Sequence, residues 1–266
     1  MNDRFDLFLF STDPSTIAES LAAGVRGVVV DWERVGKRHS QAGADTQIGE
    51  DTADDLRRVR RETPAYTLCR IDNKPELLAP QIDEALELGV DELLVPMIRS
   101  AAEAEDMLDL VAGRCGVGIL VETRAVLDDL DDLAALPLSR VYVGLNDLAI
   151  DRRRANIFEA LVDGTVDEIR SHFSVPFGLA GLTVLDGGAP IPCRLIVGEL
   201  ARLGCSFSFL RRSYQADIRG RDPQEEIPRL LVELERAGLR TAAEVEADRD
   251  ALAEAVEAWP GTPVAL

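Results

Sequence analysis

The sequence predicts an α/β protein: a single-domain (β/α)8 TIM barrel with an extra C-terminal helix. Eight short apolar segments alternate with longer amphipathic segments along the 266-residue chain. The apolar segments are rich in β-branched residues and apolar throughout, which is typical of parallel strands covered on both faces. Eight strands with helical crossovers over about 240 residues match the number and length expected of such a barrel.

The expected strands follow one another at the spacing that a barrel requires. An open doubly wound sheet is the alternative fold, but it normally has fewer strands and a glycine-rich first turn. The first turn here reads STDPST rather than G-x-G-x-x-G. The expected strands cover residues 5–11, 27–32, 65–71, 92–97, 117–122, 140–145, 177–184 and 205–210.

The segments between the strands carry the signals that begin and end helices. Asp13 and Pro14 supply a cap and a first-turn proline for a helix that stops at Gly24. Ser100 is followed three residues later by Glu103, which is the spacing of a capping box. Two further helices are expected to end on glycine, at residues 74–89 and 222–238.

The chain shows no repeat or low-complexity linker, so residues 1–240 are assigned to one catalytic barrel. Residues 241–266 form a C-terminal helix and tail that could pack on a neighbouring subunit or stay exposed to solvent. No secretory signal and no apolar run long enough to span a membrane are evident. The four cysteines lack C-x-x-C spacing, which is typical of reduced thiols, and we expect a cytoplasmic protein.

The charge balance argues against two classes of partner. There are 29 basic and 48 acidic residues, giving a net charge of −19. Nucleic acids and anionic membranes attract the opposite sign, so neither is expected as a partner. Lys37 and Lys74 are the only lysines, and both follow strands two and three in loops. Schiff-base chemistry, which needs a lysine in the site, is therefore not expected.

Polar residues gather where the expected strands end. The apolar segment 117–121 runs into the carboxylate of Glu122, and a buried carboxylate without a partner costs several kcal/mol. The active site of such a barrel lies at the C-terminal ends of its strands. Charge is nearly absent within the strands and is concentrated at those ends: Asp31 and Glu33, Arg70, Glu122, Asn146 and Asp147, and Arg211 and Arg212.

Two of these carboxylates suit a divalent cation. Glu122 and Asp147 follow adjacent strands, with Arg70 nearby. Mg²⁺ takes oxygen ligands, keeps several waters and is typically held by one or two protein carboxylates together with the substrate. Zinc is less natural, because no histidine or cysteine lies in a ligand-spaced cluster. The alternative is a structural ion pair with Arg70 or Arg124 at the rim.

Three segments resemble the HpcH/HpaI aldolase and citrate lyase β-subunit family. They are LVPMIRSAAEAEDM (94–107), ILVETRAVLDDLDDLAAL (119–136) and VYVGLNDLA (141–149). With an arginine ending strand three, the pieces of the family pattern occur in order over about residues 27–150. Members of this family are metal-dependent barrels of the phosphoenolpyruvate/pyruvate type, and the resemblance implies that architecture here.

The resemblance also implies roles for individual residues. Glu122 and Asp147 would be the ligands of Mg²⁺ or Mn²⁺. Arg70 would hold the oxygen of a pyruvate-like enolate, and backbone N–H groups near Asn146 and Asp147 would hold the substrate carboxylate. A dication with Arg70 beside it would stabilise the charge that develops as the enolate forms.

The chain departs from the family pattern after strand two. The aldolase branch has D-x-E-H there, whereas Asp31 and Glu33 are followed by Arg34, and His39 comes six positions after Glu33. A glutamine common in the aldolase branch is replaced by Leu120. The candidate bases are therefore His39 or a water on the metal that Glu33 orients. In the citrate lyase β branch, Asp31 and Glu33 would hold such a water.

We therefore expect a metal-dependent carbon–carbon lyase, a class II-type aldolase that acts next to a 2-oxo acid such as pyruvate or oxaloacetate through an enolate. An aldehyde or acyl acceptor would be its second substrate. Arg211 and Arg212 could bind a second carboxylate or a phosphate, or could pair with surface acids. The alternatives are a citrate lyase β-like acyl-CoA lyase or thioesterase, and a non-catalytic barrel for assembly or small-acid binding. The family commonly forms homo-oligomers (dimers, trimers or hexamers) through swapped eighth helices, which residues 222–238 could provide.

Overall fold

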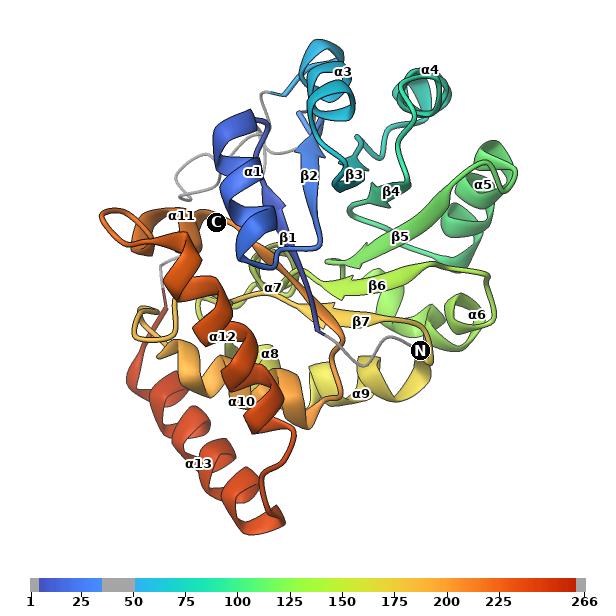
Figure 1. The fold of residues 1–266 in the computed structure, drawn as a ribbon. Coiled ribbons are helices and arrows are strands. Elements are labelled where there is room, and N and C mark those ends of the chain that lie inside the picture. Colours follow the sequence, from blue (N-terminus) through green and yellow to red (C-terminus); the bar gives the residue numbers. More distant parts are fainter. Residues whose placement is uncertain (1–4, 35–50, 262–266) are drawn as a thin grey trace.

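The computed structural model describes residues 5–34 and 51–261, which form a closed barrel of parallel strands surrounded by helices (Figure 1). Each strand pairs with the next one in the chain, and β8 pairs with β1 to close the barrel. The expected (β/α)8 fold is confirmed. The strands are β1 (Asp6–Phe10), β2 (Gly27–Asp31), β3 (Tyr66–Arg70), β4 (Glu92–Val95), β5 (Gly116–Val121), β6 (Arg140–Val143), β7 (Phe177–Leu179) and β8 (Phe207–Leu210).

Most of the helices lie outside the ring of strands (Figure 1). Extra short helices follow β5, β6 and β8, so some connections contain more than one helix. The helices are α1 (Pro14–Ala23), α3 (Ala53–Glu62), α4 (Pro75–Glu87), α5 (Ala101–Val111), the 3₁₀ helix η1 (Ala125–Asp129), α6 (Leu130–Ala134), α7 (Leu145–Asp151), α8 (Glu159–Val162), α9 (Thr165–His172), α10 (Cys193–Arg202), α11 (Arg212–Asp217), α12 (Pro223–Ala237) and α13 (Ala242–Ala258).

The helix ends follow the expected signals. The side chain of Asp13 accepts a hydrogen bond from the Thr16 N–H at 2.8 Å, which satisfies a donor of the first turn of α1. Gly24 ends this helix with φ of 116°, a left-handed conformation that glycine adopts without a Cβ penalty. Ser100 caps α5 by accepting from the Glu103 N–H at 3.3 Å, but the Glu103 carboxylate accepts from the Arg99 N–H at 2.9 Å, so the expected capping box is only half formed.

The seventh strand is shorter than expected. β7 covers only Phe177–Leu179, whereas the sequence predicted a strand over 177–184. Gly181 has φ of 112°, outside the extended region of a strand. The apolar segment therefore leaves the barrel wall as an irregular loop, although Leu182 and Val184 remain buried.

The barrel interior is filled by side chains that alternate along the strands. Successive strand residues point to opposite faces, so every second residue faces inward. The inner core contains Val29, Leu68, Leu120 and Phe209, each at most 2% exposed. The residues two positions further along these strands, towards the C-terminal mouth, have the same inward orientation: Asp31, Arg70, Glu122 and Arg211.

A second group of charges is buried at the opposite, N-terminal end of the barrel. Arg140 Nε and Nη2 donate to the two carboxylate oxygens of Glu92 at 2.6 and 2.7 Å. The Tyr66 hydroxyl and the Ser139 hydroxyl also donate to Glu92, at 3.0 and 2.6 Å. Arg140 lies over the Phe8 ring, with Cζ 4.6 Å from its centroid. The concentration of charge at the C-terminal strand ends is therefore not complete, because a hydrogen-bonded pair is also buried at the strand starts.

The C-terminal helix packs on its own chain. α13 lies against α10 and α8 on the outside of the barrel (Figure 1). The Asn156 side chain donates to the carbonyl oxygens of Val256 and Trp259, both at 2.8 Å, and the Trp259 ring meets Phe158 edge-on. Packing on a neighbouring subunit stays a prediction. In residues 5–34 and 51–261, none of the helices has the length and apolar character needed to cross a membrane.

Candidate active site

The central contact of the barrel mouth is an ion pair between β3 and β2. Arg70 is fully buried, and its Nε and Nη2 donate to the two carboxylate oxygens of Asp31 at 2.8 and 2.6 Å. Such two-pronged contacts fix the plane of the guanidinium. Burial alone would lower the pKa of Arg70, but Asp31 and then Glu33 outweigh it, so the pKa is raised and the charge is secured.

The third nitrogen of Arg70 faces a different carboxylate. Nη1 lies 2.7 Å from Glu33 Oε2, which is an ion pair, but its N–H directions make no hydrogen bond to any described residue. Two nitrogens of Arg70 are thus fixed by Asp31, and Nη1 is the one that makes no hydrogen bond to the described residues. The sequence placed Arg70 at the site, but the role of Asp31 in orienting it was missed.

A second layer of contacts holds Asp31. Its backbone N–H donates to Asp51 Oδ2 at 2.8 Å, and the Thr12 hydroxyl donates to Asp51 Oδ1 at 3.3 Å. Burial raises the pKa of Asp51, even though the Asp31 N–H acts in the opposite direction. The Trp32 N–H donates to the Arg70 carbonyl at 2.8 Å and continues the β2–β3 pairing past the strand end.

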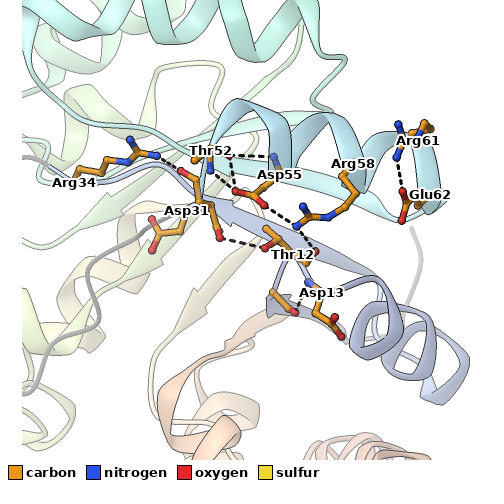
Figure 2. A network of polar contacts seen from close by, with 11 residues as sticks. Thr12, Asp13, Asp31, Arg34, Thr52, Asp55, Arg58, Arg61 and Glu62 are labelled. Atoms are coloured by element: carbon orange, nitrogen blue, oxygen red, sulfur yellow. Dashed lines mark hydrogen bonds and ion pairs between the residues drawn. The ribbon is translucent and has the colours of Figure 1, made fainter.

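The start of α3 is tied to this layer. Thr52 and Asp55 form a reciprocal capping box, and Arg58 bridges from Asp55 to the Thr12 carbonyl at 2.6 and 3.1 Å (Figure 2). Arg34 donates to the Asp51 carbonyl and extends the same network (Figure 2). The mouth is therefore braced on the β1–β2 side by hydrogen bonds from three segments.

Glu122 enters the mouth directly after β5. It is 2% exposed, and its Oε2 accepts the Met97 N–H at 3.1 Å. Met97 has φ of 55°, a left-handed conformation that costs a non-glycine residue about 1–2 kcal/mol. A Cβ at Gly144 would overlap Glu122 Oε1, so the neighbouring strand end needs a glycine there to admit the carboxylate. The left-handed backbone of Met97 and the absence of a side chain at Gly144 both allow Glu122 to occupy this position.

Asn146 and Asp147 lie in the first turn of α7, which starts directly after β6. Both are partly buried. Because Val121 pairs with Val143, Glu122 and the start of α7 lie at the same rim of neighbouring strands. The described part of the chain holds no group of three or more His, Cys, Asp or Glu side chains placed to share a metal ion. Two carboxylate ligands are nevertheless sufficient for a cation that keeps water and substrate oxygens as its other ligands.

Arg211 and Arg212 follow β8, but the structure separates them. Arg211 lies over the Phe10 ring, with Cζ 4.4 Å from its centroid, on the inner side of the barrel. Burial and then the like charge of Arg70 lower the pKa of Arg211. Arg212 is the first residue of α11 and is partly exposed. Only Arg211 therefore shares the interior with Arg70.

Tyr142 is a residue near the mouth that the sequence analysis did not single out. It lies in the inner core, with its ring 4.3 Å from that of Phe209. Burial raises the pKa of Tyr142, with Arg211 as the largest opposing influence, so the phenol stays neutral. Tyr142 and Gly144 are two positions apart and lie on the same face of β6. The alternation of side chains along this strand could therefore have identified Tyr142. His39 lies outside the described residues.

Comparison with solved structures finds the same fold in several proteins of low sequence identity. The HpcH/HpaI aldolase from Desulfitobacterium hafniense DCB-2 has a TM-score of 0.55 at 14% identity, covering 78% of this chain and 86% of its own. RipC from Yersinia pestis has a TM-score of 0.57 at 17% identity, covering 92% and 100%. The citrate synthase SbnG has a TM-score of 0.56 at 17% identity, covering 90% and 96%.

At these identities the likeness shows the fold alone. No family model matches the sequence, and no curated protein sequence matches it either.

Proposed function

We propose that the protein is a metal-dependent carbon–carbon lyase of the HpcH/HpaI aldolase type, acting next to a 2-oxo acid through an enolate. One observation carries the proposal: at the C-terminal mouth, Asp31 fixes Arg70 so that its Nη1 can donate to a ligand, while Glu122 points into the same mouth. An anchored cation beside an inward carboxylate suits the stabilisation of a developing oxyanion. The shared fold with a named aldolase agrees with this chemistry.

Glu122 and Asp147 would hold Mg²⁺ or Mn²⁺. The donor set fits, since both offer carboxylate oxygens at one rim, and both the Gly144 position and the Met97 N–H favour the observed placement of Glu122. The cation would supply Lewis-acid polarisation of the keto group. Asn146, beside Asp147, would contribute to binding of the substrate carboxylate.

The remaining residues would bind the substrate or take part in proton transfer. Arg70 would donate through Nη1 to the substrate oxygen on which negative charge develops, while Asp31 keeps the guanidinium in place. Glu33, next to Nη1, is placed to orient a water that takes the methyl proton, and His39 is the other candidate base. In this proposal Asp31 is a positioning residue.

Exchange of the pyruvate methyl protons with solvent tests the proposal. We expect exchange that depends on Mg²⁺ or Mn²⁺ and falls by at least about 100-fold in Glu122→Gln, because a preorganised charge in the site is lost. Glu87→Gln, an exposed carboxylate on α4, is the matched control and should exchange like the wild type. Absence of exchange in the folded wild-type protein with either metal would overturn the proposal and favour a non-catalytic barrel.

An acyl-CoA lyase or thioesterase of the citrate lyase β type is the second candidate. The citrate synthase SbnG has a TM-score comparable to that of the aldolase, so the fold does not separate the two. This candidate requires retention of CoA esters without exchange of pyruvate protons. Calorimetric titration with acetyl-CoA, together with the exchange measurement, distinguishes them.

A further inference from the structure

Arg211 is an arginine in the barrel mouth that forms no ion pair with the residues that the structure describes. It stands over the same Phe10 ring as Arg70, whose Cζ lies 5.3 Å from the ring centroid. Among residues 5–34 and 51–261, none forms an ion pair with Arg211, and its Nε, shielded from solvent, has no hydrogen-bond partner. The residue as a whole is partly exposed, although its Nε is not.

Three other arginines near the mouth have protein partners. Arg70 is held by Asp31, and Arg34 donates to the Asp51 carbonyl. Arg99 forms an ion pair with Glu103 at 3.7 Å. Arg211 differs from them because its charge is directed into the interior and its hydrogen-bonding capacity is unmet within the described residues.

This arrangement costs stability. A shielded donor without an acceptor costs about 1–3 kcal/mol, and arginine does not escape the cost by losing its proton. Burial and the neighbouring charge of Arg70 both oppose the charge of Arg211. An anion that binds at Arg211 would offset this cost, so the fold favours a negatively charged group at this point.

We propose that Arg211 binds a second carboxylate of the ligand, carried by the acceptor that adds to the enolate. This proposal rests on the proposed function and adds to it the class of acceptor. A planar guanidinium against an aromatic ring suits a planar carboxylate. Asp31 and Glu122 act on the same position, and their negative charge disfavours a phosphate dianion more than a carboxylate.

The acceptor preference in pyruvate aldol addition tests this assignment. Glyoxylate and glycolaldehyde are aldehydes of equal chain length, but only glyoxylate carries a carboxylate. We expect wild-type kcat/KM to favour glyoxylate, and Arg211→Met to lose about 10- to 100-fold with glyoxylate, the value of a charge-assisted hydrogen bond, while activity with glycolaldehyde changes little. Arg211→Lys should recover part of the loss, because it keeps the charge but not the planar fork.

Arg99→Met is the matched control, since Arg99 follows β4 at the same end of the barrel but is exposed and ion-paired. It should retain the wild-type acceptor preference. Equal kcat/KM for the two aldehydes in the wild type, or an unchanged preference in Arg211→Met, would overturn the assignment. Pyruvate proton exchange should persist in Arg211→Met, which separates this outcome from failure of the proposed function.

Binding and unfolding provide readouts that need no turnover. By calorimetry with Mg²⁺ present, we expect the wild type to bind malonate more tightly than 3-hydroxypropionate, and Arg211→Met to bind the two equally. Arg211→Met should also melt at the same or a higher temperature, because an unmatched cation is removed. Equal malonate binding by wild type and variant, stronger competition by inorganic phosphate, or a lower melting temperature in the variant would each contradict a ligand-binding role.

Discussion

The two ends of the barrel interior bury the same pair of chemical groups in different states. At the N-terminal end, one arginine, Arg140, meets one carboxylate, Glu92, and hydroxyls supply further hydrogen bonds to that carboxylate. At the C-terminal mouth, Arg70 faces Asp31 and Glu33 and keeps one nitrogen without a hydrogen bond to the described residues. Arg211 lies nearby and forms no ion pair within residues 5–34 and 51–261.

The difference indicates what each end is for. A buried ion pair in which both carboxylate oxygens are hydrogen-bonded, as those of Glu92 are, leaves little capacity for a ligand. Groups left partly satisfied raise the energy of the free protein, and that cost is offset when a ligand binds. This contrast supports the proposal that a ligand binds at the C-terminal mouth and not at the N-terminal end.

The largest expected effect is on stability, at the closed end. Glu92→Ala leaves Arg140 buried without its carboxylate and should lower the free energy of unfolding by about 3–5 kcal/mol. Replacing both residues, as Glu92→Leu with Arg140→Met, should restore most of the loss. Urea unfolding measures both, and a single variant as stable as the wild type would show that the pair has no structural role.

Arg70→Lys tests the open end. The charge remains, but the two-pronged contact with Asp31 is lost, so exchange of pyruvate protons should fall by about 10²–10³-fold. Unfolding should show a smaller loss, about 1–3 kcal/mol, because Asp31 keeps one charged partner. If exchange survives while stability collapses, Arg70 belongs with Arg140 as a structural group and the contrast fails.

The pH dependence of stability should differ in sign between two neighbouring carboxylates of the mouth. Burial raises the pKa of Asp51 above 3.8, so the folded state holds that proton more tightly and stability falls as pH rises through the shifted pKa. Burial would also raise the pKa of Asp55, but hydrogen bonds from Thr52 and Arg58 outweigh it and lower the pKa. Asp55 therefore adds stability above its ordinary pKa, and that stability is lost on acidification.

Unfolding measured from pH 3 to pH 7 separates the two. As pH rises, the free energy of unfolding of Asp51→Asn should increase relative to that of the wild type. The free energy of unfolding of Asp55→Asn should decrease relative to that of the wild type over the same range. Parallel pH profiles for the two variants would contradict the assignment of these shifts to burial and to capping.

The smallest effect is expected at the helix that braces the mouth. Thr52→Ala removes the capping side chain of α3 and should cost about 1 kcal/mol in unfolding free energy. Pyruvate proton exchange should be nearly unchanged, since α3 only supports Asp51 and Thr12. A large loss of activity from this variant would place α3 closer to the chemistry than the contacts indicate.

The sequence carried most of the fold because its signals are local. Cap residues such as Asp13 and Ser100 and the eight apolar segments predicted elements that the structure contains. The end of β7 was missed because Leu182 and Val184 are buried in a loop, and burial in a loop leaves the same apolar pattern as a strand.

The sequence indicated which residues lie at the C-terminal mouth but not the contacts that they make there. The strand ends identified Asp31, Arg70 and Glu122, because parallel strands end at one face. The choice of Asp31 as the partner of Arg70 depends on register and on parity across two strands, which no local pattern encodes. For the same reason Glu92 and Arg140, 48 positions apart, were not recognised as a pair, and the lack of a partner for Arg211 became evident only in three dimensions.

The most direct test of the central claim is Mn²⁺ binding measured by electron paramagnetic resonance. If the mouth holds a divalent cation through Glu122 and Asp147, the wild type should bind one Mn²⁺, and Glu122→Gln and Asp147→Asn should each weaken that binding strongly. Glu87→Gln should bind like the wild type. Undiminished Mn²⁺ affinity in both mouth variants, or no binding by the folded wild-type protein, would contradict the account.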